Sequence, residues 1–240
     1  MTYSNPIITS SGKPKIRTAI QSPSRRNFVV GAASLTGLFL SGCTRTAKVT
    51  NPTAPAFSRN YALMYGPMPL EKFPIPGIDL RKVPAKYYRR QVDYQTSERV
   101  GTIIVDTKNF YLYLVQEGGK AMRYGVGLGR AGFEWQGRAR VGWKQEWPKW
   151  TPPEEMIMRQ PELRKYSAKN GGMPPALDNP LGARAIYIFK GKTDTLYRLH
   201  GTLESWSIGK AVSSGCVRLL NQDIIDLYRR VPTNSPIVVA

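Results

Sequence analysis

Short runs of β-branched and aromatic residues dominate the second half of the chain, from Arg99 onwards, and turn-forming residues separate them. The segments KN and EGGK supply turns between the first three runs, and GKTD separates the next two. The runs occupy residues 101–106, 110–116, 121–129, 183–190, 195–201 and 236–240. Because runs of this length and composition are typical of strands, the pattern predicts a mainly β domain over residues 99–240.

Two segments interrupt this pattern. The sequence QDIIDLYRR, residues 222–230, places its apolar residues on one side of a helix, with Asn221 as a suitable N-cap and Pro232 after the end. Residues 135–182 show no periodicity and are rich in tryptophan and proline, so we expect an irregular, lid-like loop there. The pattern therefore predicts only one or two short helices in the domain.

The preceding segment, residues 44–98, is predicted to be a proline-rich linker and N-terminal arm. Its first part has no periodicity, and residues 61–90 contain five prolines followed by the basic and aromatic sequence AKYYRRQVDY. We interpret this part as an extended arm on the surface of the domain.

The first 43 residues have the features of a targeting segment. The sequence SRRNFVVGAASLTGLFLSGC, residues 24–43, resembles a twin-arginine export signal, and its apolar run is shorter than the ~20 residues that span a bilayer. It ends in LSGC, which resembles a lipobox in which Cys43 is acylated and becomes the mature N-terminus. Ordinary cleavage nearby, without acylation, is the alternative. With either acylation or ordinary cleavage, the signal predicts an exported protein of the periplasm or cell envelope of a bacterium. Acylation of Cys43 would in addition attach the protein to a membrane.

The charge of the chain fits an envelope location. The chain of 240 residues has 35 basic and 16 acidic residues, a formal net charge of +19, which favours an anionic partner. An exported protein meets cell-wall polymers and lipid headgroups rather than chromosomes, so nucleic acid is not the expected partner.

Several classes of site are disfavoured by residue counts and spacing. The chain has one histidine, no C-x-x-C and no carboxylate cluster with zinc-ligand spacing, so we expect no metal site. The glycines at 125, 127 and 129 lack the third fingerprint glycine and a following helix, and we interpret them as a strand end. Ser207 and Lys210 match S-x-x-K, the nucleophile motif of penicillin-binding serine enzymes. Ser10 and Lys13 match it too, and the partner motif K-T-G is missing, so a serine nucleophile is disfavoured.

The remaining candidates are the single histidine, His200, and Cys216. A cysteine nucleophile needs a base or cation beside it, because a free thiol is only a few per cent ionised near neutrality, and imidazole is the usual base. Gly215 would let a substrate carbonyl approach closely and would free backbone N–H groups for an oxyanion hole. From these residues alone, a catalytic pair and two unrelated structural residues are equally supported.

The surrounding motif separates these alternatives. The sequence HGT…SIG…SSGCVRL closely resembles the signature of the L,D-transpeptidases (the YkuD-type catalytic domain), and the resemblance covers about residues 99–240. It implies a β-sandwich-like catalytic domain in which Cys216 is the nucleophile and His200 the general base and acid, oriented by the backbone around Gly201. The supporting motif positions that it implies are Ser213, Gly215 and Arg218.

The family commonly has Ser-His-Gly-Cys, whereas this chain has Ser214 in place of that histidine. Every role that needs an imidazole then falls on His200, and any step that needs a second imidazole is in doubt. The nucleophile and the base are both retained, so the departure alone does not indicate an inactive protein.

The resemblance implies a reaction on peptidoglycan stem peptides, without a cofactor. Cys216 would attack the carbonyl between the third and fourth residues, form a thioester and transfer the acyl group to an amine, and residues 133–175 would line the substrate cleft. An L,D-carboxypeptidase that hydrolyses the same bond is one alternative, because only the acceptor differs. A non-catalytic wall-binding lipoprotein is the other.

Overall fold

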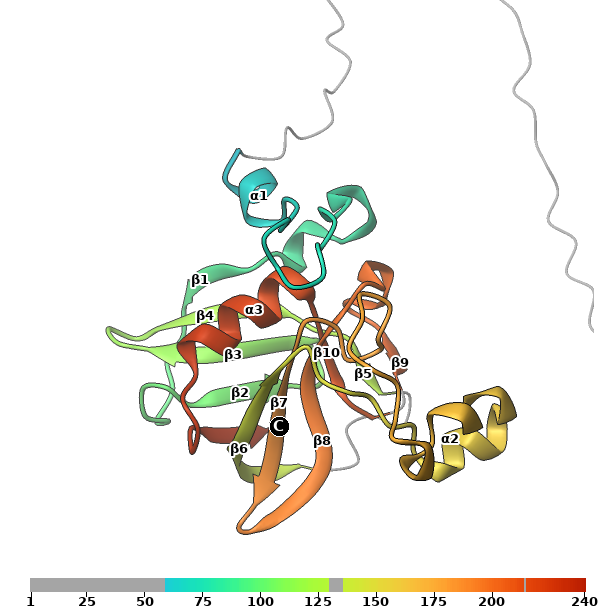
Figure 1. Ribbon diagram of the computed structural model, residues 1–240. Helices are drawn as coiled ribbons and strands as arrows, with labels where there is room; N and C mark the ends of the chain where they lie inside the picture. The colour runs from blue at the N-terminus through green and yellow to red at the C-terminus, as the bar shows by residue number, and fades with distance from the viewer. Residues whose placement is uncertain (1–58, 130–135, 214) are drawn as a thin grey trace, which may run out of the picture. The chain divides into compact units, whose positions relative to one another are not determined.

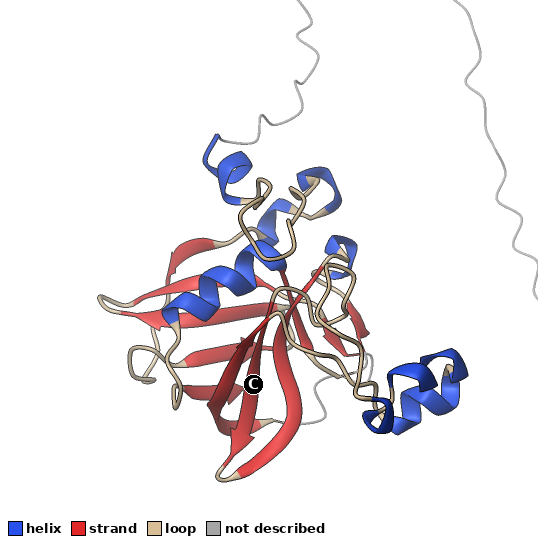
Figure 2. Ribbon diagram, viewed as in Figure 1, coloured by secondary structure: helices blue, strands red, loops and turns tan. Residues whose placement is uncertain are grey.

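The computed structural model describes residues 59–129, 136–213 and 215–240. The described part of the chain is built on a nine-stranded sheet with the order β1-β4-β3-β2-β11-β6-β7-β8-β10 (Figures 1 and 2). Its strands are β1 (Arg90–Asp93), β2 (Ile103–Asp106), β3 (Tyr111–Gln116), β4 (Lys120–Gly125), β6 (Gly137–Glu146), β7 (Arg184–Lys190), β8 (Thr193–Thr202), β10 (Val217–Leu220) and β11 (Pro236–Val239). The pairs β2–β11 and β8–β10 are parallel, and the other neighbours are antiparallel.

Short helices and a second, two-stranded sheet complete the described part. The second sheet pairs β5 (Leu128–Gly129) with β9 (Ala211–Ser213) in parallel. The α-helices are α1 (Arg59–Met64), α2 (Glu154–Arg159) and α3 (Asn221–Arg230). The 3-10 helices are η1 (Leu80–Lys82), η2 (Ala85–Tyr87), η3 (Pro161–Tyr166), η4 (Ala168–Asn170) and η5 (Ser205–Ser207). No helix in the described residues is long and apolar enough to cross a membrane.

The main core lies between the two halves of the curled sheet and helix α3. Side chains from β2, β3, β7, β8, β10, β11 and α3 form one buried cluster, so strands far apart in the sheet order pack on each other in a sandwich-like way. Ile186, Leu199 and Leu219 are fully buried in it, and each contributes roughly 1.5–3 kcal/mol of hydrophobic stabilisation. The mainly β fold with few helices is confirmed.

The predicted strands 101–106, 110–116, 183–190, 195–201 and 236–240 correspond to β2, β3, β7, β8 and β11. Residues 121–129 contain β5 and all of β4 except its first residue. Local pattern was sufficient there because each run contributes buried side chains to the core.

The prediction that residues 135–182 are wholly irregular is wrong. Residues 137–146 form β6, which pairs with β7 on one side and β11 on the other. Only Val141 in this strand is fully buried, so the strand has no alternating apolar pattern that the sequence could reveal. Gly142 is required by packing, since a Cβ there would lie 2.1 Å from Cδ2 of Phe189. The rest of the segment carries α2, η3 and η4, which extend to one side of the sheet (Figure 1).

The predicted N-cap of the last helix is also wrong. Helix α3 begins at Asn221 itself, and its N-cap residue, Leu220, makes no side-chain capping bond. The Asn221 side chain instead accepts a hydrogen bond from the backbone N–H of Ala183 at 2.9 Å. A long-range partner thus replaces the local one, while Ile224, Ile225 and Leu227 are buried as the periodicity predicted.

Residues 59–98 contain short helices and strand β1 and pack against the sheet, whereas the sequence predicted an extended arm on the surface of the domain. Strand β1 pairs with β4, and Tyr65, Tyr87 and Tyr88 form a buried cluster with Ile208 and Leu220. These residues belong to the same compact unit as the sheet. The predicted export signal in residues 1–43, with Cys43, lies outside the described residues.

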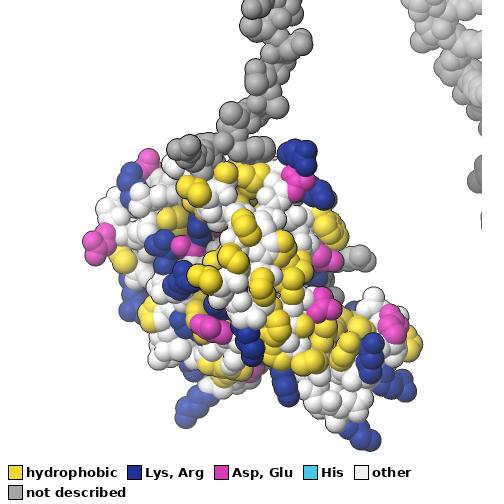
Figure 3. Space-filling model, turned by 45° about the horizontal axis from the view of Figure 1, so that its top comes forward, with side chains coloured by type: hydrophobic (Ala, Val, Ile, Leu, Met, Phe, Trp, Pro, Cys, Tyr) yellow, Lys and Arg dark blue, Asp and Glu magenta, His cyan; other side chains and the backbone are white. Residues whose placement is uncertain are grey.

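Figure 3 shows one face of the molecule, on which apolar side chains gather in the middle and lysines and arginines lie scattered around them. Positive charge on this face is therefore spread out rather than collected into one patch.

Candidate active site

Strands β8 and β10 lie side by side and bring the two sequence candidates together. They pair in parallel, with Val217 opposite Leu199 and Arg218 opposite His200. Cys216 directly precedes β10, so the same register sets it beside Arg198. Because side chains alternate across a strand, Arg198, His200, Cys216 and Arg218 share one side of the sheet.

The His200 ring is buried and held by a backbone carbonyl. Its Nδ1 lies 2.8 Å from the carbonyl oxygen of Gly201. Because that oxygen can only accept a hydrogen bond, Nδ1 carries the proton and Nε2 is the basic nitrogen. Burial lowers the pKa of His200 to about 4, the hydrogen bond to Gly201 opposes this shift, and the charges of Arg218 and Arg198 add to it. The ring is therefore neutral near pH 7.

Three chain segments, around residues 182, 201 and 221, lie very close together beside His200 and hold its backbone in place. A Cβ on Gly201 would lie 2.1 Å from Oδ1 of Asn221 and 3.1 Å from the backbone N of Ala183. Gly182, with φ +61°, is also close to that oxygen, since a Cβ there would lie 2.4 Å from it. The start of α3 therefore packs directly on the backbone of β8, and only glycine fits at both positions.

Cys216 is half-buried as a residue, and its thiol is not in a disulfide. Burial of the thiol raises its pKa above the usual value, while a hydrogen bond from the backbone of Arg198 and the charges of Arg198 and Arg218 act in the opposite direction. A thiol with a raised pKa beside an imidazole with a lowered one means that both are uncharged at neutral pH.

The glycine stretch before residue 130 supports the loop that carries the thiol. Gly127 exchanges two backbone hydrogen bonds with Arg218, at 2.9 and 2.8 Å. A Cβ on Gly129 would lie 2.6 Å from Cα of Gly215, which itself has φ +136°. The strand-end interpretation of these glycines is confirmed, since β4 ends at Gly125 and β5 ends at Gly129. Gly129 allows a close approach to Gly215, whereas a Cβ on Gly127 would lie 2.6 Å from the backbone oxygen of Ser207.

Residues between His200 and Cys216 in the chain also hold the backbone around the site in place. Arg218 donates from Nη1 to Oε2 of Glu204 at 2.5 Å. The hydroxyl of Ser207, a buried residue, donates to the backbone carbonyl of Glu204 at 2.6 Å. Ser207 therefore has a structural partner, which gives no support to the S-x-x-K interpretation. Glu204 was not predicted, because nothing in the local sequence identifies it as the partner of Arg218.

Of the predicted supporting residues, Ser213 ends β9, and Gly201, Gly215 and Arg218 lie around the pair as described above. Ser214 lies outside the described residues, so its role stays a prediction. Among the described residues, no group of three or more His, Cys, Asp or Glu side chains is placed to hold a metal ion.

The model of the L,D-transpeptidase catalytic domain (YkuD) matches residues 101–239, more than half of the chain. The chain belongs to the L,D-transpeptidase family. The match contains the strands β2 to β11 and therefore both His200 and Cys216.

Relatives within the family include proteins of Escherichia coli and Bacillus subtilis. The chain is 35% identical over 147 residues to the probable L,D-transpeptidase ErfK/SrfK of Escherichia coli K12, covering 57% of this chain and 43% of that protein. It is 40% identical over 77 residues to the putative L,D-transpeptidase YqjB of Bacillus subtilis 168, covering 31% of this chain and 42% of that one. The chain thus spans less than half the length of these curated relatives.

A similar solved structure is that of a protein from Brucella melitensis described as a probable carnitine operon oxidoreductase. It is 41% identical, with a TM-score of 0.46, and the match covers 64% of this chain and 94% of that one. Membership of the L,D-transpeptidase family rests on the domain match.

Proposed function

We propose that this chain is a peptidoglycan L,D-transpeptidase, with Cys216 as nucleophile and His200 as general base and acid. The observation that supports this best is the hydrogen bond between Nδ1 of His200 and the carbonyl of Gly201. It leaves Nε2 as a proton acceptor on the side of the sheet where Cys216 lies.

In the proposed first half-reaction, the sulfur of Cys216 attacks the carbonyl carbon of the third stem-peptide residue, and the thiol proton passes to Nε2 of His200. Backbone N–H groups near Gly215 and Cys216 stabilise the resulting oxyanion. When the carbon–nitrogen bond to the fourth residue breaks, Nε2 returns the proton to the departing amine. A thioester to Cys216 remains.

In the second half-reaction an amine acceptor attacks the thioester carbonyl and loses a proton to Nε2. The carbon–sulfur bond breaks, a new amide forms, and the sulfur recovers its proton from the imidazole. The acceptor is an amine of a second stem peptide or of a protein, and hydrolysis in place of transfer would make the chain an L,D-carboxypeptidase.

The opposite pKa shifts determine when the proton moves. Because burial raises the pKa of the Cys216 thiol and lowers that of the His200 imidazole to about 4, proton transfer between them is unfavourable in the free enzyme. A preformed thiolate–imidazolium pair is therefore scarce. The proton is transferred as the substrate carbonyl is attacked, when bond formation to sulfur offsets this cost.

We further propose that the N-terminal segment directs export to the bacterial envelope and that Cys43 is acylated there. This proposal is supported by the sequence SRRNFVVGAASLTGLFLSGC and by the wall substrate that the proposed reaction requires. Intact mass of the mature protein from the membrane fraction tests this, and an unacylated mature chain that lacks Cys43 would contradict it.

The nucleophile is tested by intact mass after incubation with a carbapenem, to which members of this family are typically susceptible. We expect one covalent adduct on the full chain, lost in Cys216→Ala and kept in Cys43→Ser, the matched control at the only other cysteine. With stem tetrapeptides, a cross-linked dimer indicates transfer and a shortened monomer hydrolysis. The proposal would be refuted if the protein formed no adduct with the carbapenem and no product from the stem tetrapeptides.

A further inference from the structure

Arg198 lies two residues before His200 on β8 and is fixed by two side-chain contacts. Its guanidinium donates to both oxygens of Asp194, from Nη1 at 2.7 Å and from Nη2 at 2.8 Å. It also lies over the ring of Tyr187, 4.2 Å from the ring centre. Tyr187 in turn stacks on Trp143, with ring centres 3.7 Å apart and planes 15° from parallel. A planar cation held by a two-pronged carboxylate and an aromatic face has little freedom to move.

The backbone departs from a regular strand to make the Asp194 contact. Residues four apart in a regular strand lie about 13 Å from each other, too far for an ion pair. Here Tyr187 pairs with Arg198 and Phe189 with Asp194, so β8 contains two extra residues between these pairs. Leu196, inside this bulge, has φ +62° although it is a bulky residue, and its N–H donates to Asp194 at 2.9 Å. Strained backbone of this kind often marks a functional site.

The fixed cation lies at the candidate active site. The β8–β10 register sets Arg198 beside Cys216, on the side of the sheet that carries His200. The positive charge of Arg198 lowers the pKa of the thiol and that of the imidazole. A cation at this position therefore favours negative charge on sulfur and does not assist the imidazolium. The other arginine at the site, Arg218, is paired with Glu204, whose side chain is 51% exposed.

We propose that Arg198 is a positioning residue of the reaction, whose guanidinium, held by Asp194 and Tyr187, stabilises the negative charge that develops on the sulfur of Cys216. The inference rests on the proposed function, since it assigns Arg198 a part in the same acyl transfer. A merely structural Arg198 would only hold the β7–β8 hairpin together, and its loss would change stability without changing the ionisation of the thiol.

The test measures the rate of iodoacetamide alkylation of Cys216 against pH, by intact mass, in the full chain carrying Cys43→Ser. Arg198→Met keeps most of the side-chain volume and removes the charge, and we expect it to move the ionisation midpoint upward by at least half a pH unit. Arg198→Lys should recover part of that shift. Carbapenem acylation at neutral pH should slow about tenfold or more in Arg198→Met.

Arg140→Met is the matched control. Arg140 is on the neighbouring strand β6, lies over the ring of Phe189 and donates to Gly191 and Asn234, and its charge is not among those that shift the pKa of Cys216. We expect its alkylation profile to match that of the unchanged chain. An unchanged midpoint in a folded Arg198→Met variant would overturn the inference.

If Arg198→Met does not fold, Asp194→Asn provides the second test. It removes the countercharge and leaves the cation, so the midpoint should fall, and an unchanged midpoint would again overturn the inference. Alkylation needs no peptidoglycan, so these results are separate from the fate of the proposed function. The carbapenem adduct and the stem-peptide products decide that function.

Discussion

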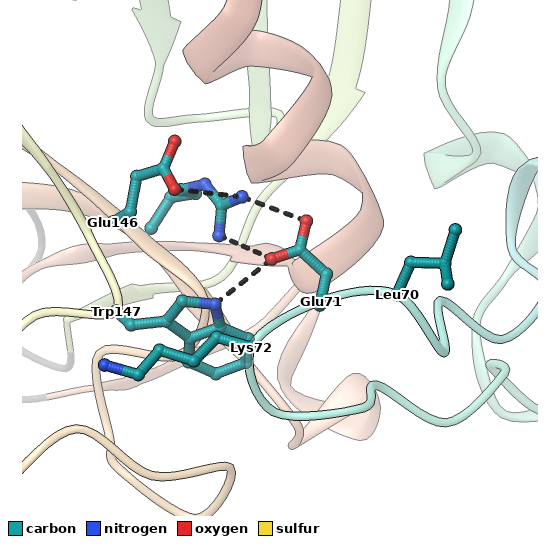
Figure 4. Close-up of a pocket in the computed structure, with 6 residues that line it drawn as sticks. Leu70, Glu71, Lys72, Glu146 and Trp147 are labelled. Carbon is teal, nitrogen blue, oxygen red and sulfur yellow. Dashed lines mark hydrogen bonds and ion pairs between the residues drawn. The ribbon is translucent and has the colours of Figure 1, made fainter.

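Replacing Glu71 by alanine should destabilise the fold by several kcal/mol, because it leaves a buried arginine without its main partner. Glu71 lies in the arm, and its carboxylate accepts from Nη1 and Nη2 of Arg184, both at 2.9 Å, and from Nε1 of Trp147 at 3.1 Å (Figure 4). The side chains of Glu71 and Arg184 are only 11% and 6% exposed. The contact ties the arm to the first residue of β7, the strand that pairs with β8 next to His200.

The size of the effect follows from that burial. Breaking a buried ion pair typically costs about 3–5 kcal/mol, because one charge stays buried and unpaired. Two features favour the lower end of the range. Glu146 lies 3.7 Å from Arg184, and an adjoining pocket of about 400 Å³ gives water access to the pair. We therefore expect about 3 kcal/mol, which corresponds to a fall of roughly 6–12 °C in melting temperature for a domain of this size.

Urea unfolding followed by tryptophan fluorescence measures the change in unfolding free energy. Glu146→Ala is the matched control, since its carboxylate is 60% exposed and its contact with Arg184 is long, so we expect less than about 1 kcal/mol. The double variant Glu71→Ala with Arg184→Met should be more stable than Glu71→Ala alone, because no buried charge remains. A cost for Glu71→Ala no larger than that of the control would refute the reasoning.

Two further predictions follow from the shifted pKa values at the site. The folded pKa of His200, about 4, lies below the unfolded value of 6.5, so about 3 kcal/mol of stability is present above pH 6.5 and lost as the pH falls towards 4. Urea unfolding across this range should show that loss, and His200→Gln should abolish it; an equal acid loss in the variant would contradict the assignment. Alkylation of Cys216 should keep rising through pH 9, because burial raises the pKa of its thiol. A rate plateau between pH 6 and 8 would instead indicate a preformed ion pair.

The strands and the last helix could be predicted because their signals are local. In β2 and β7 consecutive residues are buried, and in β3 burial alternates over the first four residues. In α3 the apolar residues Ile224, Ile225 and Leu227 are buried, so the core residues of each element lie close together in the chain. Strand β6 could not be predicted in this way. It lies between β7 and β11 and buries only Val141 completely, so backbone pairing with partners far along the chain makes it a strand.

The same distinction applies to the candidate site. Its main residues were found from scarcity and motif, because a single histidine and the sequence SSGC can be recognised without knowing where they lie. The partners that hold the supporting residues in place were not found. The partnership of Arg218 with Glu204, of Asn221 with Ala183 and of the glycines with their neighbours depends on contacts between segments that the sequence keeps apart.

By itself, the sequence identified the candidate reacting groups, the family and the local strand pattern, because these depend on residue type and spacing. Only the tertiary structure decided that the imidazole and the thiol are both neutral at rest and that Arg198 is fixed beside them. Protonation depends on burial and on nearby charge, and both arise only when β8, β10 and their distant neighbours pack together.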